Sequence, residues 1–132
     1  TSYLSATGLD QDDAQAGAYG SAHDTAQLFT YILKMHPEIF NETASAKVTI
    51  SSLAAFRYTA TNTNERVVDV PGIIASKTGY TALAGGNLAI VIDAGIGRPI
   101  VVVALGSTAE GRFLDVETLA HASLETISAE GK

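Results

Sequence analysis

The sequence predicts an α+β domain in which an antiparallel sheet is covered by helices. Residues 87–92 and 100–105 are apolar runs joined by the loop 95–99, which is typical of an antiparallel hairpin. Apolar residues recur at helical spacing from Ser21 onward, and again in a long helix that starts near Glu110. We expect the C-terminal helix to cover this sheet and the earlier helix to belong to another layer. Because residues 87–92 are apolar on both faces, we expect one face of the sheet to pack against a segment outside residues 1–132.

Composition limits the class of protein. Hydrophobic residues make up 46% of the 132 residues, which is enough for a packed core and too many for a disordered chain. The net charge of −6, without any basic run, argues against a nucleic-acid partner. The absence of cysteine excludes a disulfide scaffold and thiolate metal sites. No apolar run reaches the roughly 18 residues of a membrane span. The length predicts that residues 1–132 are one domain or part of one. We also expect a processed or excerpted chain, because the polar residues after Thr1 do not form a signal peptide.

The first helix is predicted from Ser21 to His36. Ser21 is a cap residue, and Asp24 stands three residues later, as in a variant capping box. The helix ends at His36 because a residue before proline disfavours the helical conformation. Its apolar face is expected to contain Ala22, Ala26, Phe29 and Leu33.

A turn and two short strands follow this helix. Residues 37–40 are expected to direct Ile39 and Phe40 inward. Strands are predicted at 48–50 and 56–60, where apolar residues alternate with polar ones. The remaining turns and breaks are expected at residues 61–64 and, after an apolar run at 67–70, at residues 71–72.

The strand predicted at residues 73–77 carries the start of the sequence Ser76-Lys77-Thr78-Gly79-Tyr80-Thr81. From the apolar runs and the hairpin loop at 95–99, we expect it to be an accessible edge strand of the antiparallel sheet, next to residues 87–92. Lysine supplies a fixed positive charge with three donors, and threonine supplies a hydroxyl beside it. Glycine leaves space for a substrate that lies along the strand. Lys-Thr-Gly on a strand is a known catalytic signature, although the tripeptide alone is weak evidence.

Other polar residues are interpreted as structural. Asp10, Asp12 and Asp13 are expected to be solvated loop carboxylates rather than a cation site, because their spacing lacks the glycine and the terminal glutamate of a calcium loop. The three histidines are expected to be exposed or structural: His23, His36 and His121. We expect neither a metal nor a cofactor.

These elements, in this order, resemble the serine-type D-alanyl-D-alanine carboxypeptidases, the low-molecular-mass penicillin-binding proteins. The resemblance covers most of the chain and rests on several separate phrases. They are Thr7-Gly8-Leu9-Asp10, the helix from Ser21-Ala22-His23-Asp24 to Pro37-Glu38-Ile39-Phe40, Asn62-Thr63-Asn64, Lys77 to Thr81, Ala84-Gly85-Gly86-Asn87-Leu88, and Gly106 to Arg112. The resemblance implies a β-lactamase/transpeptidase-like fold.

Two motifs of that family are absent from the sequence. No serine stands three residues before any lysine, so the nucleophilic Ser-x-x-Lys is absent, and no Ser-x-Asn occurs either. In the family, both motifs precede the Gly-Leu-Asp segment. We therefore expect residues 1–132 to be the C-terminal portion of the catalytic domain, packed against the N-terminal half of the same polypeptide, and inactive without it.

The resemblance implies a site and a substrate. The family removes the terminal residue of peptidoglycan D-Ala-D-Ala stem peptides by acyl transfer to serine, and β-lactam antibiotics acylate the same serine. The resemblance implies a catalytic role for the motif residues Lys77, Thr78 and Gly79. It implies that the substrate carboxylate meets Lys77, Thr78 and Arg112. The backbone N–H of Tyr80 is implied to complete an oxyanion hole. Tyr80 and Thr81 are expected to line the cleft.

The resemblance also implies a place in the cell and leaves two rival functions. We expect the protein at the periplasmic or extracellular face of a bacterial membrane. One alternative is a class A-like β-lactamase, whose deacylating carboxylate would also lie outside these residues. The other is a non-catalytic cell-wall-binding module, which would keep the sheet and lose the nucleophile.

Overall fold

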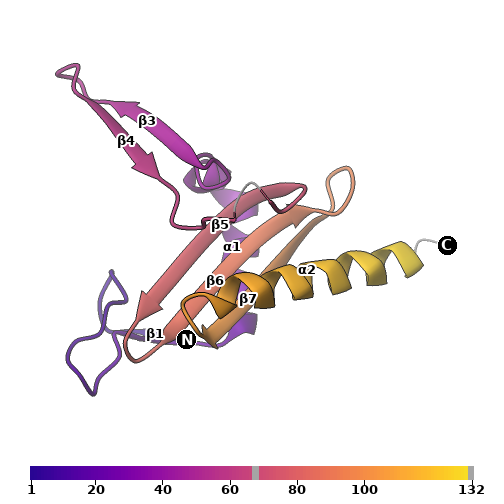
Figure 1. The fold of residues 1–132 in the computed structure, drawn as a ribbon, viewed down its shortest axis with the longest axis horizontal. Helices are drawn as coiled ribbons and strands as arrows, with labels where there is room; N and C mark the ends of the chain where they lie inside the picture. The colour runs from indigo at the N-terminus through magenta and orange to yellow at the C-terminus, as the bar shows by residue number, and fades with distance from the viewer. Residues whose placement is uncertain (67–68, 131–132) are drawn as a thin grey trace.

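The computed structural model describes residues 1–66 and 69–130, so residues 67 and 68 of the predicted run at 67–70 lie outside it. Figure 1 shows a sheet with helices on either side and a hairpin that projects away from it. The elements, in order, are β1 (Ser2–Tyr3), β2 (Ala18–Tyr19), α1 (Ala22–Met35), the 3₁₀ helix η1 (Pro37–Phe40), β3 (Lys47–Ser51), β4 (Arg57–Thr61), β5 (Ile73–Thr81), β6 (Gly85–Asp93), β7 (Pro99–Ser107) and α2 (Gly111–Glu130).

The central sheet is antiparallel and has the strand order β5-β6-β7. The register pairs Ser76 with Ile90 and Gly79 with Asn87 across β5 and β6, and it pairs Ile90 with Val102 across β6 and β7. The predicted antiparallel hairpin is confirmed. The strand that carries the motif is longer than predicted: it continues through Thr81 and does not end at residue 77.

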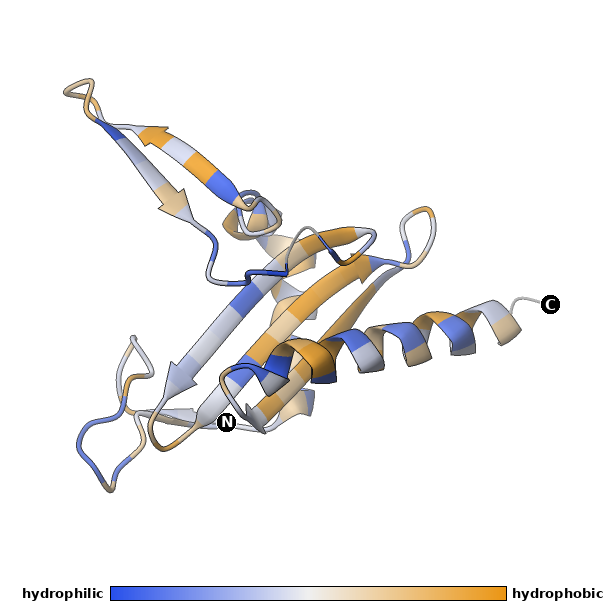
Figure 2. Cartoon of the chain, in the orientation of Figure 1, coloured by the Kyte–Doolittle hydropathy of each residue, from blue (hydrophilic) through white to orange (hydrophobic). Residues whose placement is uncertain are grey.

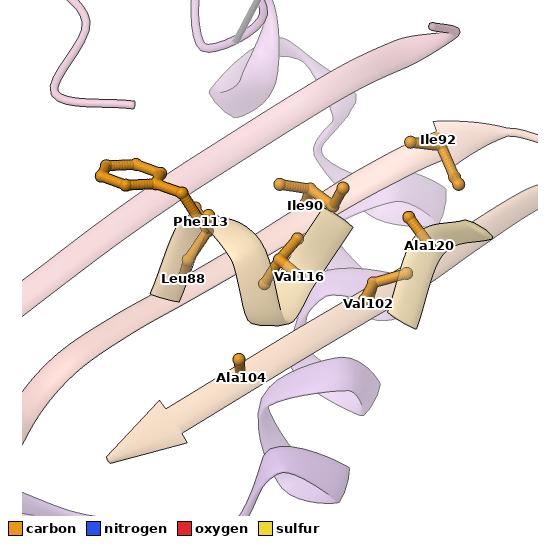
Figure 3. Close-up of a cluster of buried hydrophobic side chains, with 8 residues drawn as sticks. All are labelled: Leu88, Ile90, Ile92, Val102, Ala104, Phe113, Val116 and Ala120. Carbon is orange, nitrogen blue, oxygen red and sulfur yellow. The ribbon is translucent and has the colours of Figure 1, made fainter. Parts of the chain in front are cut away.

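The two faces of the sheet are covered by different helices. Alternate side chains of β6 point to opposite faces. Leu88, Ile90 and Ile92 join a cluster with α2 residues (Figure 3), whereas Ala89 and Val91 join a cluster with Phe29 of α1. Figure 2 shows β6 and β7 as the most apolar part of the chain. The prediction of a covered strand is confirmed, but the expectation that one of its faces needs a segment outside residues 1–132 is wrong for β6, because α1 covers the face opposite α2.

The helices begin near the predicted residues. The Oγ of Ser21 accepts a hydrogen bond from the backbone N–H of Asp24 at 3.0 Å, which caps α1. Phe29 of α1 and Phe40 of η1 stack with ring centroids 5.0 Å apart. The prediction that Ile39 points inward is wrong: its side chain is 58% exposed, because η1 turns only Phe40 towards the sheet. Among the described residues, no helix is long and apolar enough to cross a membrane.

The strands β3 and β4 form a separate two-stranded hairpin. Both predicted strands are confirmed, but Phe56 lies before β4 and not within it. Val48 pairs with Ala60 and Ile50 pairs with Tyr58, so one face of the hairpin is apolar. The base of this hairpin lies beside β5, next to the motif (Figure 1).

Candidate active site

The motif lies on an edge strand of the described sheet. β5 pairs with β6 on one side only, and no described strand pairs with its other side. Lys77 is exposed, and its ammonium donates a hydrogen bond to the backbone carbonyl of Thr78. The prediction of an edge strand next to residues 87–92 is therefore confirmed.

The backbone of β5 directs hydrogen-bonding groups to the free side. The N–H of Ser76 donates to Thr43 Oγ1 at 3.2 Å, and Ser76 Oγ donates to the Thr43 carbonyl at 2.7 Å. Thr43 follows η1 and covers the beginning of this edge. Because backbone groups alternate in direction along a strand, Thr78 and Tyr80 turn their N–H groups to the same free side as Ser76. The open part of the edge is therefore the part that carries the motif.

A cavity of about 250 Å³ lies along this edge. Ser76, Lys77 and Thr78 line it from β5, and residues of the β3–β4 hairpin, including Val48 and Ile50, line it from the opposite side. The cavity is therefore bounded by the cationic Lys77 on β5 and by the apolar residues Val48 and Ile50 on β3.

Thr78 is held by a residue outside the motif. Its side chain is buried, and its hydroxyl is hydrogen-bonded to the hydroxyl of Thr63. Thr63 belongs to the turn at 61–64, where Asn62 Nδ2 donates to the carbonyls of Thr43 and Ser45 at 2.8 and 3.1 Å. The sequence indicated a turn here but did not indicate that Thr63 contacts the motif. The phrase Asn62-Thr63-Asn64 was the available signal.

Arg112 reaches the motif strand from α2. Its Nη1 donates to the Gly79 carbonyl at 2.9 Å, and its guanidinium carbon lies 4.8 Å from the Phe113 ring centroid. The Nε of Arg112 is buried and has no hydrogen-bond partner among the described residues. The structure therefore brings Arg112 to Gly79, and Lys77 to Thr78. The convergence of Lys77, Thr78 and Arg112 on one anion stays a prediction.

The motif glycine is not required by packing within the described chain. A Cβ added at Gly79 would meet only Asn87 Cβ, at 3.6 Å, which is an ordinary contact. After it, Tyr80 is 60% exposed, and Thr81 Oγ1 accepts a hydrogen bond from the Ala84 N–H at 3.0 Å. Thr81 thus helps to form the β5–β6 turn.

A second cavity, of about 520 Å³, is lined by Gly79, Thr81 and the N-terminal segment. Asp10 lines it, and its Oδ2 accepts a hydrogen bond from the Leu83 N–H at 3.1 Å. The Oδ1 of Asp10 is buried without a partner among the described residues. The prediction that Asp10 is a solvated carboxylate is therefore wrong, because the N-terminal segment folds back over the β5–β6 turn. Asp12 and Asp13 are exposed, as expected.

Among the other described titratable residues, Glu42 lines the cavity beside the motif. His23, His36 and His121 are exposed, as predicted. Within the described ranges, no group of three His, Cys, Asp or Glu side chains is placed to hold a metal ion. The predicted site residues Lys77, Thr78 and Arg112 therefore lie beside β5 together with one carboxylate, Glu42.

Comparison with protein families gives one match. The model of a family described as D-alanyl-D-alanine carboxypeptidase matches residues 1–109. Lys77 to Thr81 lie inside the matched stretch, and Arg112 lies beyond it. No curated protein sequence matches the chain.

Solved structures give further matches. A penicillin-binding protein from Listeria monocytogenes, solved in a cefotaxime-bound and an ampicillin-bound form, matches with 28% identity and a TM-score of 0.74, over 92% of this chain and 47% of that protein. A D-alanyl-D-alanine carboxypeptidase from Mycobacterium tuberculosis matches with 28% identity and a TM-score of 0.59, over 74% of this chain and 35% of that protein. A Streptomyces DD-transpeptidase shares the fold at 19% identity and a TM-score of 0.65, over 82% of this chain and 42% of that protein. The chain therefore spans less than half the length of these proteins.

Proposed function

The chain belongs to the D-alanyl-D-alanine carboxypeptidase family, and from this premise we propose that it supplies the substrate-binding strand of a serine-type enzyme that trims peptidoglycan stem peptides. The observation that carries the proposal is the free edge of β5, where Lys77 is exposed and the backbone N–H groups of Thr78 and Tyr80 face outward. An extended peptide that lies along this edge would pair with the backbone as an added strand.

The reaction is acyl transfer followed by hydrolysis. A serine oxygen attacks the carbonyl of the penultimate D-alanine, the C–N bond to the terminal D-alanine breaks, and that residue leaves as the free amino acid after gaining a proton. Water then cleaves the serine ester and regenerates the hydroxyl. The negative charge that develops on the carbonyl oxygen needs donors in fixed positions. The outward N–H of Tyr80 is one such donor, because β5 is held by β6 along its whole length.

The terminal carboxylate of the substrate would be met by the two cations beside β5. Lys77 lies at the free edge, and Arg112 is tied to the Gly79 carbonyl from the start of α2. A guanidinium can hold a carboxylate through two parallel hydrogen bonds, which a single ammonium cannot do. The hydroxyl of Thr78, oriented by Thr63, would add a neutral donor between them. Gly79 would let the substrate approach the strand closely.

The serine and its base would come from a segment that precedes these residues in the complete enzyme. No Ser-x-x-Lys or Ser-x-Asn occurs in residues 1–132, and acyl transfer requires an activated nucleophile beside a base. The Listeria protein, of which this chain covers 47%, was solved with β-lactams bound, which supports β-lactam binding by the complete enzyme here. We place its action at the outer face of the membrane, where peptidoglycan lies.

A non-catalytic wall-binding module is the second candidate, because residues 1–132 keep the sheet and contain neither nucleophile motif. Labelling with a fluorescent penicillin separates the two. The complete enzyme should become covalently labelled, residues 1–132 alone should not, and adding the N-terminal half should restore labelling. Failure of the complete protein to label would favour the non-catalytic module. Labelling of residues 1–132 alone would reveal a nucleophile in this chain.

The site itself is tested by removing a cation. Arg112→Ala in the complete enzyme should lower kcat/KM for a D-Ala-D-Ala peptide by about 2 kcal/mol of transition-state free energy, as for the loss of one charged contact. Arg98→Ala is the matched control, because Arg98 lies in the loop between β6 and β7, far from the motif end of the sheet. An unchanged kcat/KM in Arg112→Ala would remove Arg112 from the site.

A further inference from the structure

Asn87 uses both ends of its side chain to join three segments. Its Oδ1 accepts a hydrogen bond from the Gly106 N–H at 2.9 Å. Its Nδ2 donates to the Gly85 carbonyl at 2.9 Å. Asn87 itself belongs to β6 and is the register partner of Gly79 on β5. One amide therefore connects the motif strand, the β5–β6 turn and the end of β7.

Gly106 is the point at which the chain departs from the regular sheet. The β6–β7 register shifts between Gly86 and Leu88, and Gly106 has a φ of 72°, which favours glycine. The Asn87 side chain fixes the backbone at this joint. Without the Asn87 side chain, the Gly106 N–H would lose this hydrogen bond.

The path from Gly106 to α2 is short and closely held. Thr108 Oγ1 accepts from the Gly111 N–H at 2.8 Å, and the Thr108 carbonyl accepts from the Arg112 N–H at 3.2 Å. The backbone of Thr108 also packs against Gly86, where an added Cβ would come within 2.0 Å of the Thr108 carbonyl oxygen. A displacement of Gly106 would therefore be transmitted to the first turn of α2.

Arg112 closes this path on the motif strand. Its Nη1 lies 2.9 Å from the carbonyl oxygen of Gly79, the residue that faces Asn87 across the β5–β6 pair. The contacts form a ring that runs from Gly79 to Asn87, through Gly106 to Arg112, and back to Gly79. Four elements, β5, β6, β7 and α2, each contribute one member.

We infer that Asn87 is a positioning residue that sets where the Arg112 guanidinium stands relative to β5. It touches no substrate. It acts through Gly106 and the start of α2. The inference rests on the proposed function, in which Arg112 meets the carboxylate of the substrate. Loss of Asn87 should therefore weaken recognition of that carboxylate more than it weakens the chemical step.

The experiment compares two substrates in the complete enzyme. One peptide ends in D-Ala-D-Ala with a free carboxylate, and the other carries the same sequence with the carboxylate converted to an amide. The measured quantity is the ratio of the two kcat/KM values. A purely structural loss lowers both values together and leaves the ratio unchanged. A displaced Arg112 lowers the ratio.

Asn87→Ala should lower the ratio at least fivefold, mainly through KM for the free acid. Arg112→Ala should lower it further, and the double variant should match Arg112→Ala alone, because the two residues act in one path. Asp93→Ala is the matched control. Asp93 also lies on β6 and accepts two hydrogen bonds, from Gly95 at 3.1 Å and Arg98 at 3.2 Å, but it stands at the opposite end of the strand. Its ratio should stay at the wild-type value.

Gly106→Ala tests the same joint if Asn87→Ala does not fold. No atom lies within 4 Å of the Cβ that this substitution adds, so its effect is confined to the backbone at φ 72°. It should lower the ratio in the same direction.

The outcomes separate the inference from the proposed function. The inference would be overturned, and the proposed function left standing, if Arg112→Ala lowers the ratio and Asn87→Ala does not. If Asn87→Ala does not fold, the ratio in Gly106→Ala decides in its place. An unchanged ratio in Arg112→Ala would overturn it as well, because Arg112 would then not meet the carboxylate. A wild-type enzyme that releases no D-alanine would overturn the proposed function, and the inference with it.

Discussion

The central sheet and the β3–β4 hairpin differ in both strand sequence and surroundings: β6 is apolar on both faces, whereas apolar residues alternate with polar ones in β3 and β4. Ile90 of β6 is 0% exposed, whereas Ile50 of β3 is 56% exposed. The sheet lies between α1 and α2, but the hairpin projects from it with its apolar face uncovered by the described residues (Figures 1 and 2). An isolated two-stranded hairpin is marginally stable in water. The sheet is therefore the stable part, because β6 is apolar on both faces and a helix buries each face.

This difference matters because the cavity beside the motif has one wall from each region. Lys77 and Thr78 belong to the buried sheet, and Val48 and Ile50 belong to the exposed hairpin. The polar groups to which we assign substrate binding therefore belong to the buried sheet. The apolar wall can move relative to them, since few buried contacts hold it.

The largest expected effect comes from the core of the sheet. Ile90→Ala would leave a cavity between β6 and α2 at a site that is 0% exposed, and should lower the free energy of unfolding by about 4 kcal/mol. Urea denaturation of the complete protein measures it. Ile90→Val is the matched control and should cost about 1 kcal/mol. A cost below about 1.5 kcal/mol for Ile90→Ala would show that the sheet core is no better packed than the hairpin.

The next effect concerns the end of the sheet. The Cβ of Gly86→Ala would lie 2.0 Å from the Thr108 carbonyl oxygen, so the backbone before α2 must shift. We expect a loss of about 2–3 kcal/mol of stability, measured by thermal unfolding. Gly79→Ala, on the facing strand, is the control and should change stability little, because its Cβ would make an ordinary 3.6 Å contact. Equal losses in both variants would contradict this account.

A smaller effect is expected where the N-terminal segment meets the β5–β6 turn. Asp10→Ala removes the acceptor of the Leu83 N–H, and should cost about 1 kcal/mol. The melting temperature of Asp10→Ala should fall relative to Asp13→Ala, since Asp13 is exposed in the same loop. If the two variants melt together, the hydrogen bond from Leu83 contributes nothing measurable.

The smallest effect is expected on the hairpin. Ile50→Ala should change the free energy of unfolding by less than about 0.5 kcal/mol, because its side chain is 56% exposed. The same urea titration measures it beside Ile90→Ala. A cost above about 1.5 kcal/mol would mean that another part of the complete enzyme covers this face.

The sequence predicted the sheet and its order because those strands carry strong local signals. The apolar residues of 87–92 and the loop at 95–99 were sufficient to place the motif strand at an edge. The cap of the first helix at Ser21 and the start of the second helix near Glu110 were predicted for the same reason. Local periodicity and turn chemistry act over a few residues, so a single sequence reveals them.

The contacts that orient the motif were not predictable in this way. Thr63 contacts Thr78 across 15 residues, and Asp10 contacts Leu83 across 73 residues. Neither pair shows in a local pattern, because the path of the intervening loops decides which polar groups meet. Ile39 was wrongly predicted to point inward for a related reason: the short η1 buries only one of two adjacent apolar residues. The position of Arg112 beside Gly79 likewise depends on the path between β7 and α2.

The uninterrupted order of β5, β6, β7 and α2 along the chain has a consequence for folding. Each of these elements packs on its neighbour across a short connection, so little loop-closure entropy opposes their assembly. The contacts of Asp10 and α1 with the sheet close much longer loops and are expected to form later. During synthesis, however, residues 1–40 leave the ribosome before the strands of the central sheet. We therefore expect α1 to be synthesised before the central sheet but to pack only after the sheet has formed.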